Sequence, residues 1–160
     1  MKTLFKTVGA ILVCLILLLV VLSITGFGPH DRTPGLWLKG DVVTTPVTDW
    51  SFTDKIPVVQ LQTQAWYLLP HSVNINCYAY NGQMYFVSVY PTGTPRSWNA
   101  NVIRDPHVRI KIGDQIYDRT VALVTDPAEQ QGVLEARSKK YPQLKVSGNP
   151  TIHVFRVVGD

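Results

Sequence analysis

An uninterrupted apolar segment near the N-terminus is the feature that most constrains this chain. Residues 8–24 contain 15 hydrophobic residues in 17 positions, and no charged residue lies between Lys6 and Asp31. A membrane-spanning helix needs about 20 predominantly apolar residues. The segment therefore predicts one transmembrane helix and argues against an ordinary soluble cytosolic protein.

Two lysines set the expected orientation of this helix. Lys2 and Lys6 directly precede the apolar segment, and the positive-inside rule then favours a cytoplasmic N-terminus. Residues 1–28 are predicted to form a single-pass membrane anchor, with the following domain on the extracytoplasmic side. Two alternatives stay open. The anchor could be inverted, since the basic residues Arg32 and Lys39 follow the segment, or the segment could be a cleaved signal peptide. The length of the apolar core favours the uncleaved anchor.

The rest of the chain has the composition of an ordinary globular domain. After residues 1–28, 13 basic and 11 acidic side chains remain, a net charge of +2. So small an excess argues against a nucleic-acid partner. Residues 29–35 contain two Pro and one Gly and predict a short linker, which leaves residues 36–160 as the folded domain.

The first half of this domain has the pattern of β-structure. Strands are predicted over Trp37–Val43, Val58–Ala65, Val73–Tyr80 and Gln83–Tyr90. Alternation in the second of these places one set of side chains on the inner face: Val59, Leu61, Thr63 and Ala65. Asn81-Gly82 supplies the two positive-φ residues of a type I′ turn, and so predicts a hairpin between the last two strands.

The second half mixes strands with helices. A helix of about two turns is predicted over Ser97–Arg104, and a longer one over residues 127–140, with Asp126 as its N-cap. Further strands are predicted over His107–Ile112, Gln115–Thr125 and Thr151–Val158. Strands that do not alternate with helices argue against a doubly wound sheet. The pattern predicts an α+β fold, a small antiparallel barrel with one main helix behind the N-terminal anchor.

No standard catalytic motif occurs in the chain. The four histidines are scattered, no metal site is predicted, and no catalytic residue can be named. Three aromatic side chains are interpreted as core or barrel-end residues, namely Trp37, Trp50 and Trp66, and Cys77 is interpreted as a small buried core residue.

Residues 88–109 are the richest in groups that bind ligands. Hydroxyls, free backbone N–H groups and a guanidinium are what a phosphate requires. Residues of these kinds, with a flat aromatic side chain and an amide one helical turn later, are our candidate cofactor site: Ser88, Thr92, Gly93, Arg96, Trp98 and Asn101. The alternative is a polar loop, a core tryptophan and a locally capping asparagine.

The spacing Trp98-x-x-Asn101-Val102-x-x-x-Pro106-x-Val108 resembles a segment of the deazaflavin-dependent nitroreductase family. That family belongs to the split β-barrel FMN-binding superfamily, which includes the pyridoxamine 5′-phosphate oxidase-like proteins. The resemblance covers about residues 57–125. It implies a split barrel with FMN or a deazaflavin in a groove at the barrel edge, often at a homodimer interface. The basic phosphate loop of the family is replaced here by residues 65–71, which contain no Arg or Lys.

Two functions follow from these observations. The first is a membrane-anchored flavin- or deazaflavin-dependent oxidoreductase, similar to nitroreductases and quinone reductases, in which the protein orients the cofactor. The alternative is a non-catalytic split-barrel module of the cell envelope that binds a lipid, another ligand or a protein partner.

Overall fold

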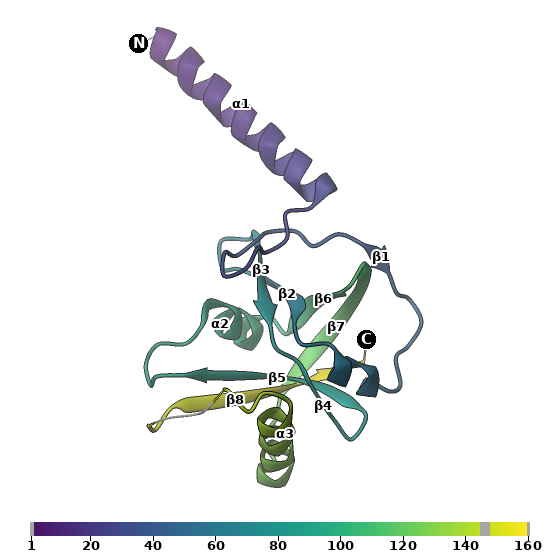
Figure 1. Ribbon diagram of the computed structural model, residues 1–160. Coiled ribbons are helices and arrows are strands. Elements are labelled where there is room, and N and C mark those ends of the chain that lie inside the picture. Colours follow the sequence, from purple (N-terminus) through teal and green to yellow (C-terminus); the bar gives the residue numbers. More distant parts are fainter. Residues whose placement is uncertain (1, 145–147, 160) are drawn as a thin grey trace.

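The computed structural model describes residues 2–144 and 148–159 of the chain. An N-terminal helix, α1 (Lys2–Thr25), projects away from a β-rich domain (Figure 1). Its segment Leu4–Thr25 has 22 residues and a mean hydropathy of 3.1. None of the most apolar part of this segment is buried against the domain, so α1 is long and apolar enough to cross a membrane.

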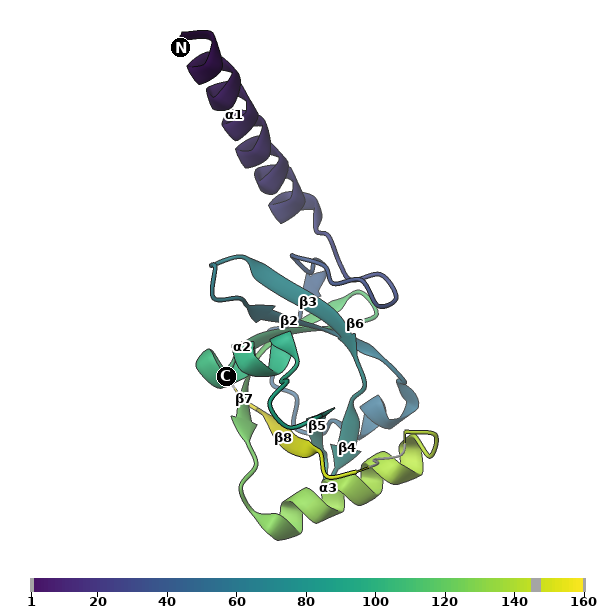
Figure 2. The same ribbon diagram turned by 90° about the vertical axis from the view of Figure 1, so that its left-hand side faces the viewer.

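Within the described residues, eight strands form one sheet in the order β3-β2-β6-β7-β8-β5-β4, with β1 paired to β7. The strands are β1 (Asp41–Val42), β2 (Val59–Gln64), β3 (Pro70–Ile75), β4 (Tyr78–Tyr80), β5 (Gln83–Tyr90), β6 (His107–Ile112), β7 (Gln115–Leu123) and β8 (Thr151–Val158). The sheet curls round on itself (Figure 2). Its two edges, β3 and β4, follow each other directly in the chain without pairing, so the barrel is split along that line.

Local sequence explains why these strands form. In β2 the predicted inward side chains Val59, Leu61 and Thr63 are all buried, while the glutamines between them are partly exposed. At the β4–β5 hairpin, Asn81 has a φ of +50° and Gly82 a φ of +72°, as a type I′ turn requires. The predicted α+β barrel is confirmed.

Two helices and a short 3-10 turn pack on the sheet. α2 (Ser97–Arg104) lies beside β2, and α3 (Pro127–Lys140) covers β4 from outside the barrel (Figure 2). The Asp126 side chain accepts a hydrogen bond from Glu129 N at 2.8 Å and so caps α3 as predicted. The 3-10 turn η1 (Ser51–Lys55) was not expected from the sequence.

The helices divide the apolar side chains into two clusters. One fills the barrel and includes Leu61, Phe86, Ile110 and Phe155. The other lies between the outside of the sheet and α3, around Tyr85 and Val133. Both faces of β5 and β8 are therefore buried near their middle, which explains why these strands are apolar on both sides.

Four expectations were wrong in detail. The Trp37–Val43 strand shortens to Asp41–Val42, and the Gln115–Thr125 strand ends at Leu123. The Val73–Tyr80 strand divides at Asn76-Cys77, because the chain there crosses between the two unpaired edges of the sheet. Trp66 is 78% exposed because it lies in the β2–β3 turn, so of its two interpretations the core one is wrong and the barrel-end one remains.

Backbone pairing attaches the segment after α1 to the barrel. Phe27 N donates to Trp37 O at 2.9 Å, and Leu36 N donates to Phe27 O at 2.7 Å. Gly35 N donates to Ser72 O at 2.8 Å, and Ser72 N donates back to Gly35 O at 3.0 Å. A Cβ at Gly35 would lie 2.4 Å from Phe27 O, so only glycine permits this approach.

We expect Gly35→Ala to lower the free energy of unfolding by about 1–3 kcal/mol, the usual effect of overpacking. The added methyl group would displace backbone, which has no flexible end to move aside. Urea unfolding of the full chain in detergent micelles measures the change. Gly159→Ala is the control, since its Cβ would meet nothing within 4 Å; equal effects of the two changes would contradict the prediction.

Candidate functional site

Two adjoining hollows lie between the linker, β3, β5, α2 and α3. The larger has a volume of about 650 Å³ and lies between the linker and the start of α2. The smaller, of about 250 Å³, continues toward β5 and α3. Both are lined by Asn74, Arg96 and Trp98. We call the combined feature the arginine groove, because Arg32 lines its first part and Arg137 its second.

Three arginines and one carboxylate, that of Asp31, line this groove. No Asp or Glu among the described residues forms an ion pair with Arg32, Arg96 or Arg137. Arg137 is only 8% exposed and has Tyr78 as a hydrogen-bonding neighbour, so its buried charge has a polar but not an anionic partner. Phosphate and carboxylate groups match the planar guanidinium fork. The groove is therefore suited to an anionic ligand.

The position of Arg137 also affects a neighbouring phenol. Burial raises the pKa of Tyr78, and the positive charge of Arg137 partly opposes this rise. Tyr78 lines the groove beside Arg137. It therefore stays a neutral hydroxyl at physiological pH, available as a hydrogen-bonding group.

Two of the predicted site residues, Arg96 and Trp98, line the groove. Arg96 is the exposed N-cap of α2, with extended backbone at φ −65° and ψ 145°. Trp98 follows in the first turn of α2 and is 6% exposed. Its ring packs edge-on against that of Phe155, with 5.8 Å between the two ring centroids. Trp98 is thus mainly a core residue that presents one edge to the groove.

The other predicted residues lie elsewhere. Ser88 is buried, and its Oγ has no hydrogen-bond partner among the described residues. Asn101 Nδ2 donates to Thr63 Oγ1 at 3.0 Å and so attaches α2 to β2. Thr92 and Gly93 are in an exposed turn before α2, where Gly93 has a φ of +89°.

Sequence reasoning missed two of the three arginines. Arg32 lies in the predicted linker and Arg137 in the last turn of the main helix, each far from Arg96 in the sequence. It also missed Asn99, which is fully buried with its side-chain amide 3.2 Å from His153 Nδ1. A basic residue on the buried face of α3 was the one local signal that could have identified Arg137.

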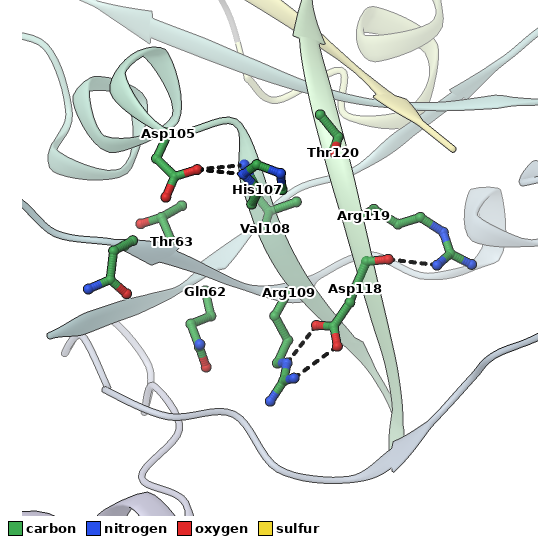
Figure 3. A pocket seen from close by; sticks show the side chains of 10 residues that line it. Gln62, Thr63, Asp105, His107, Val108, Arg109, Asp118, Arg119 and Thr120 are labelled. Atoms are coloured by element: carbon green, nitrogen blue, oxygen red, sulfur yellow. Dashed lines mark hydrogen bonds and ion pairs between the residues drawn. The ribbon is translucent and has the colours of Figure 1, made fainter. Parts of the chain in front are cut away.

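A second pocket, on the outer face of β2, β6 and β7, has its charges paired (Figure 3). Arg109 donates to both carboxylate oxygens of Asp118, at 2.7 and 2.9 Å. His107 Nδ1 lies 2.8 Å from Asp105 Oδ1, and hydrogen bonding to His107 lowers the pKa of Asp105. This pocket is therefore a weaker candidate for an anionic ligand than the arginine groove.

Cys77 is fully buried, as its predicted core role requires. Lys140 Nζ lies 3.9 Å from Cys77 Sγ, a cationic neighbour that local sequence did not reveal. Burial raises the pKa of the Cys77 thiol, and Lys140 opposes this only in part. The thiol is therefore protonated and unsuited to nucleophilic attack. Among the described residues, no three His, Cys, Asp or Glu side chains cluster as metal ligands would.

No family model and no curated protein matches the sequence. Solved structures do match. The F420-H2 dependent reductase FDR-A is 24% identical with a TM-score of 0.53, over 64% of this chain and 95% of that one. A pyridoxamine 5′-phosphate oxidase-like protein from Listeria innocua is 20% identical with a TM-score of 0.51, over 68% and 87%.

A third similar structure is a domain-swapped dimer, 23% identical with a TM-score of 0.55, over 64% of this chain and 81% of that one. At these identities the comparisons establish the fold. The expectation drawn from the Trp98 to Val108 spacing is confirmed at this level. The chain has a split β-barrel fold similar to that of these solved structures.

Proposed function

We propose that this protein is a membrane-anchored oxidoreductase that holds FMN or a deazaflavin in the arginine groove. Residues 1–28 anchor the chain, residues 29–35 form the linker, and residues 36–160 form the cofactor-binding domain. One observation carries the proposal: three arginines, against the single carboxylate of Asp31, line a groove beside Trp98 in a barrel of the split FMN-binding type.

The residues of the groove match the two parts of such a cofactor, its phosphate end and its ring system. Arg96, Arg32 and Arg137 bind its phosphate groups through charge-assisted hydrogen bonds. The edge of Trp98 contacts the ring system, and Thr92 and Gly93 form the rim before α2. Asn101 acts from behind this surface by attaching α2 to β2. Ser88 is buried in β5, and its Oγ has no hydrogen-bond partner among the described residues.

The bound cofactor supplies hydride-transfer chemistry to a quinone-like or nitroaromatic acceptor. The protein binds and orients the cofactor, and no side chain is assigned as a catalytic acid or base. The two lysines before the apolar segment support an extracytoplasmic domain. One structural neighbour is a domain-swapped dimer, which supports a homodimer as the working assembly.

The second candidate function is a non-catalytic split barrel that uses the groove for another anionic ligand or for a partner. It is favoured by the β2–β3 turn, where residues 65–71 contain no Arg or Lys. A cofactor bound only by the arginine groove would lack contacts from that turn. Titration with cofactor separates the two functions.

We expect the full chain in detergent micelles to bind FMN or a deazaflavin, and Arg96→Ala to weaken that binding about 10- to 150-fold. A hydrogen bond to a charged group contributes about 1.5–3 kcal/mol, which corresponds to that change in Kd. Quenching of cofactor fluorescence during titration gives the Kd.

Arg109→Ala is the matched control, because Arg109 is paired with Asp118 outside the groove and its loss leaves the Kd unchanged. Absence of quenching with both cofactors would reject the oxidoreductase in favour of the second function. Equal effects of Arg96→Ala and Arg109→Ala would reject the arginine groove as the site.

Asn101→Ala is expected to lower the free energy of unfolding by about 1–3 kcal/mol, because it leaves the buried Thr63 hydroxyl without its donor. Cofactor affinity should stay within about twofold, a change of about 0.4 kcal/mol. Urea unfolding and the same titration measure the two quantities. Ile103→Ala on the exposed face of α2 is the control for stability; a loss of affinity without a loss of stability would instead make Asn101 a direct ligand.

A further inference from the structure

The turn between β2 and β3 exposes three consecutive large side chains. Trp66 is 78% exposed, Tyr67 48% and Leu68 82%. Leu68 has a φ of +66°, a left-handed conformation that is unfavourable for a bulky residue. The turn is closed by its own backbone, since Leu68 N donates to Ala65 O at 3.1 Å. These side chains are thus held in solvent, where they add nothing to either core cluster.

Backbone pairing holds this turn close to the end of α1. Ser72, in the first half of β3, exchanges two hydrogen bonds with Gly35 of the linker. Figures 1 and 2 both show the β2–β3 turn on the side of the barrel from which α1 leaves. Ile24 and Phe27 at the end of α1 are also exposed, at 69% and 50%.

The chemistry of the turn matches the boundary of a bilayer. Trp and Tyr have an apolar body and a polar end, and they are enriched where membrane meets water. No Asp, Glu, Lys or Arg occurs in residues 56–95, so inserting the turn would bury no ionic charge from it. Exposed apolar patches on a folded domain mark interaction sites.

We propose that Trp66, Tyr67 and Leu68 insert into the interfacial layer of the same bilayer that α1 crosses. The inference rests on the membrane anchoring given above and deepens it. Two contacts, α1 and the turn, fix the barrel in one orientation on the membrane. The arginine groove, which is lined by Arg32 of the linker and Asn74 of β3, then opens near the membrane surface, where a lipid-soluble acceptor reaches it.

Spin labels on the full chain test this contact. Single cysteines are introduced in a Cys14→Ser background and the protein is placed in phosphatidylcholine–phosphatidylglycerol vesicles; Cys77 is fully buried and stays unlabelled. Leu68→Cys and Tyr67→Cys report the turn, and Leu17→Cys reports α1. Leu123→Cys is the matched control, since Leu123 is 48% exposed at the end of β7 remote from the linker.

We expect labels at 67, 68 and 17 to collide severalfold more often with oxygen than with a water-soluble nickel chelate, and the label at 123 to show the reverse. If the labels at positions 67 and 68 collide mainly with the nickel chelate, as the label at 123 does, while the label at 17 collides mainly with oxygen, the turn contact is wrong and the anchor stands. A label at position 17 that collides mainly with the nickel chelate overturns both the membrane anchor and the turn contact. Spin–spin broadening at 68, with both reagents excluded, would show that a second copy covers the turn and would also overturn the lipid contact.

Discussion

The pairing of Gly35 with Ser72 is the contact on which the rest of this architecture depends. It joins the segment that leaves α1 to an edge strand of the barrel through two backbone hydrogen bonds. One wall of the arginine groove is the linker segment next to this pairing, and the same pairing holds the β2–β3 turn near α1. Anchor, groove and exposed turn thus meet around Gly35, where a Cβ would collide with the backbone of residues 27–29.

The groove itself results from the way the barrel is split. Its edges β3 and β4 do not pair, and α2 and α3 pack close to this line. Arginines from the linker, the N-cap of α2 and the last turn of α3 line this gap. Arg137 is buried beside its hydrogen-bonding neighbour Tyr78 and forms no ion pair with a described carboxylate. A bound anion gives such a guanidinium an opposite charge, which is the role the proposed binding site assigns to it.

Local signals predicted most elements of the fold. The alternation in β2, the Asn81-Gly82 turn and the Asp126 cap each depend on neighbouring residues, and each is present as expected. The division between β3 and β4 was missed, because it reflects which strands pair across the sheet. The core and barrel-end interpretations of Trp66 could not be separated from the sequence, because the apolar character of a tryptophan is the same in both places.

The candidate site was only partly accessible to sequence reasoning. Arg96 and Trp98 are close in sequence and line the groove together. Ser88 and Asn101 have the right chemistry and spacing, but β5 and α2 turn them toward the interior. Arg32 and Arg137 join Arg96 only through tertiary packing, and no local pattern connects residues so far apart in the chain.

The absorbance spectrum of the full chain extracted from membranes tests the central claim, that the groove holds a flavin-type cofactor, most directly. We expect a visible flavin or deazaflavin band that is released into solution when the protein is denatured. A chain purified without the band should acquire it after incubation with FMN or a deazaflavin and removal of the unbound cofactor. A folded protein that remains colourless after that treatment would contradict the account.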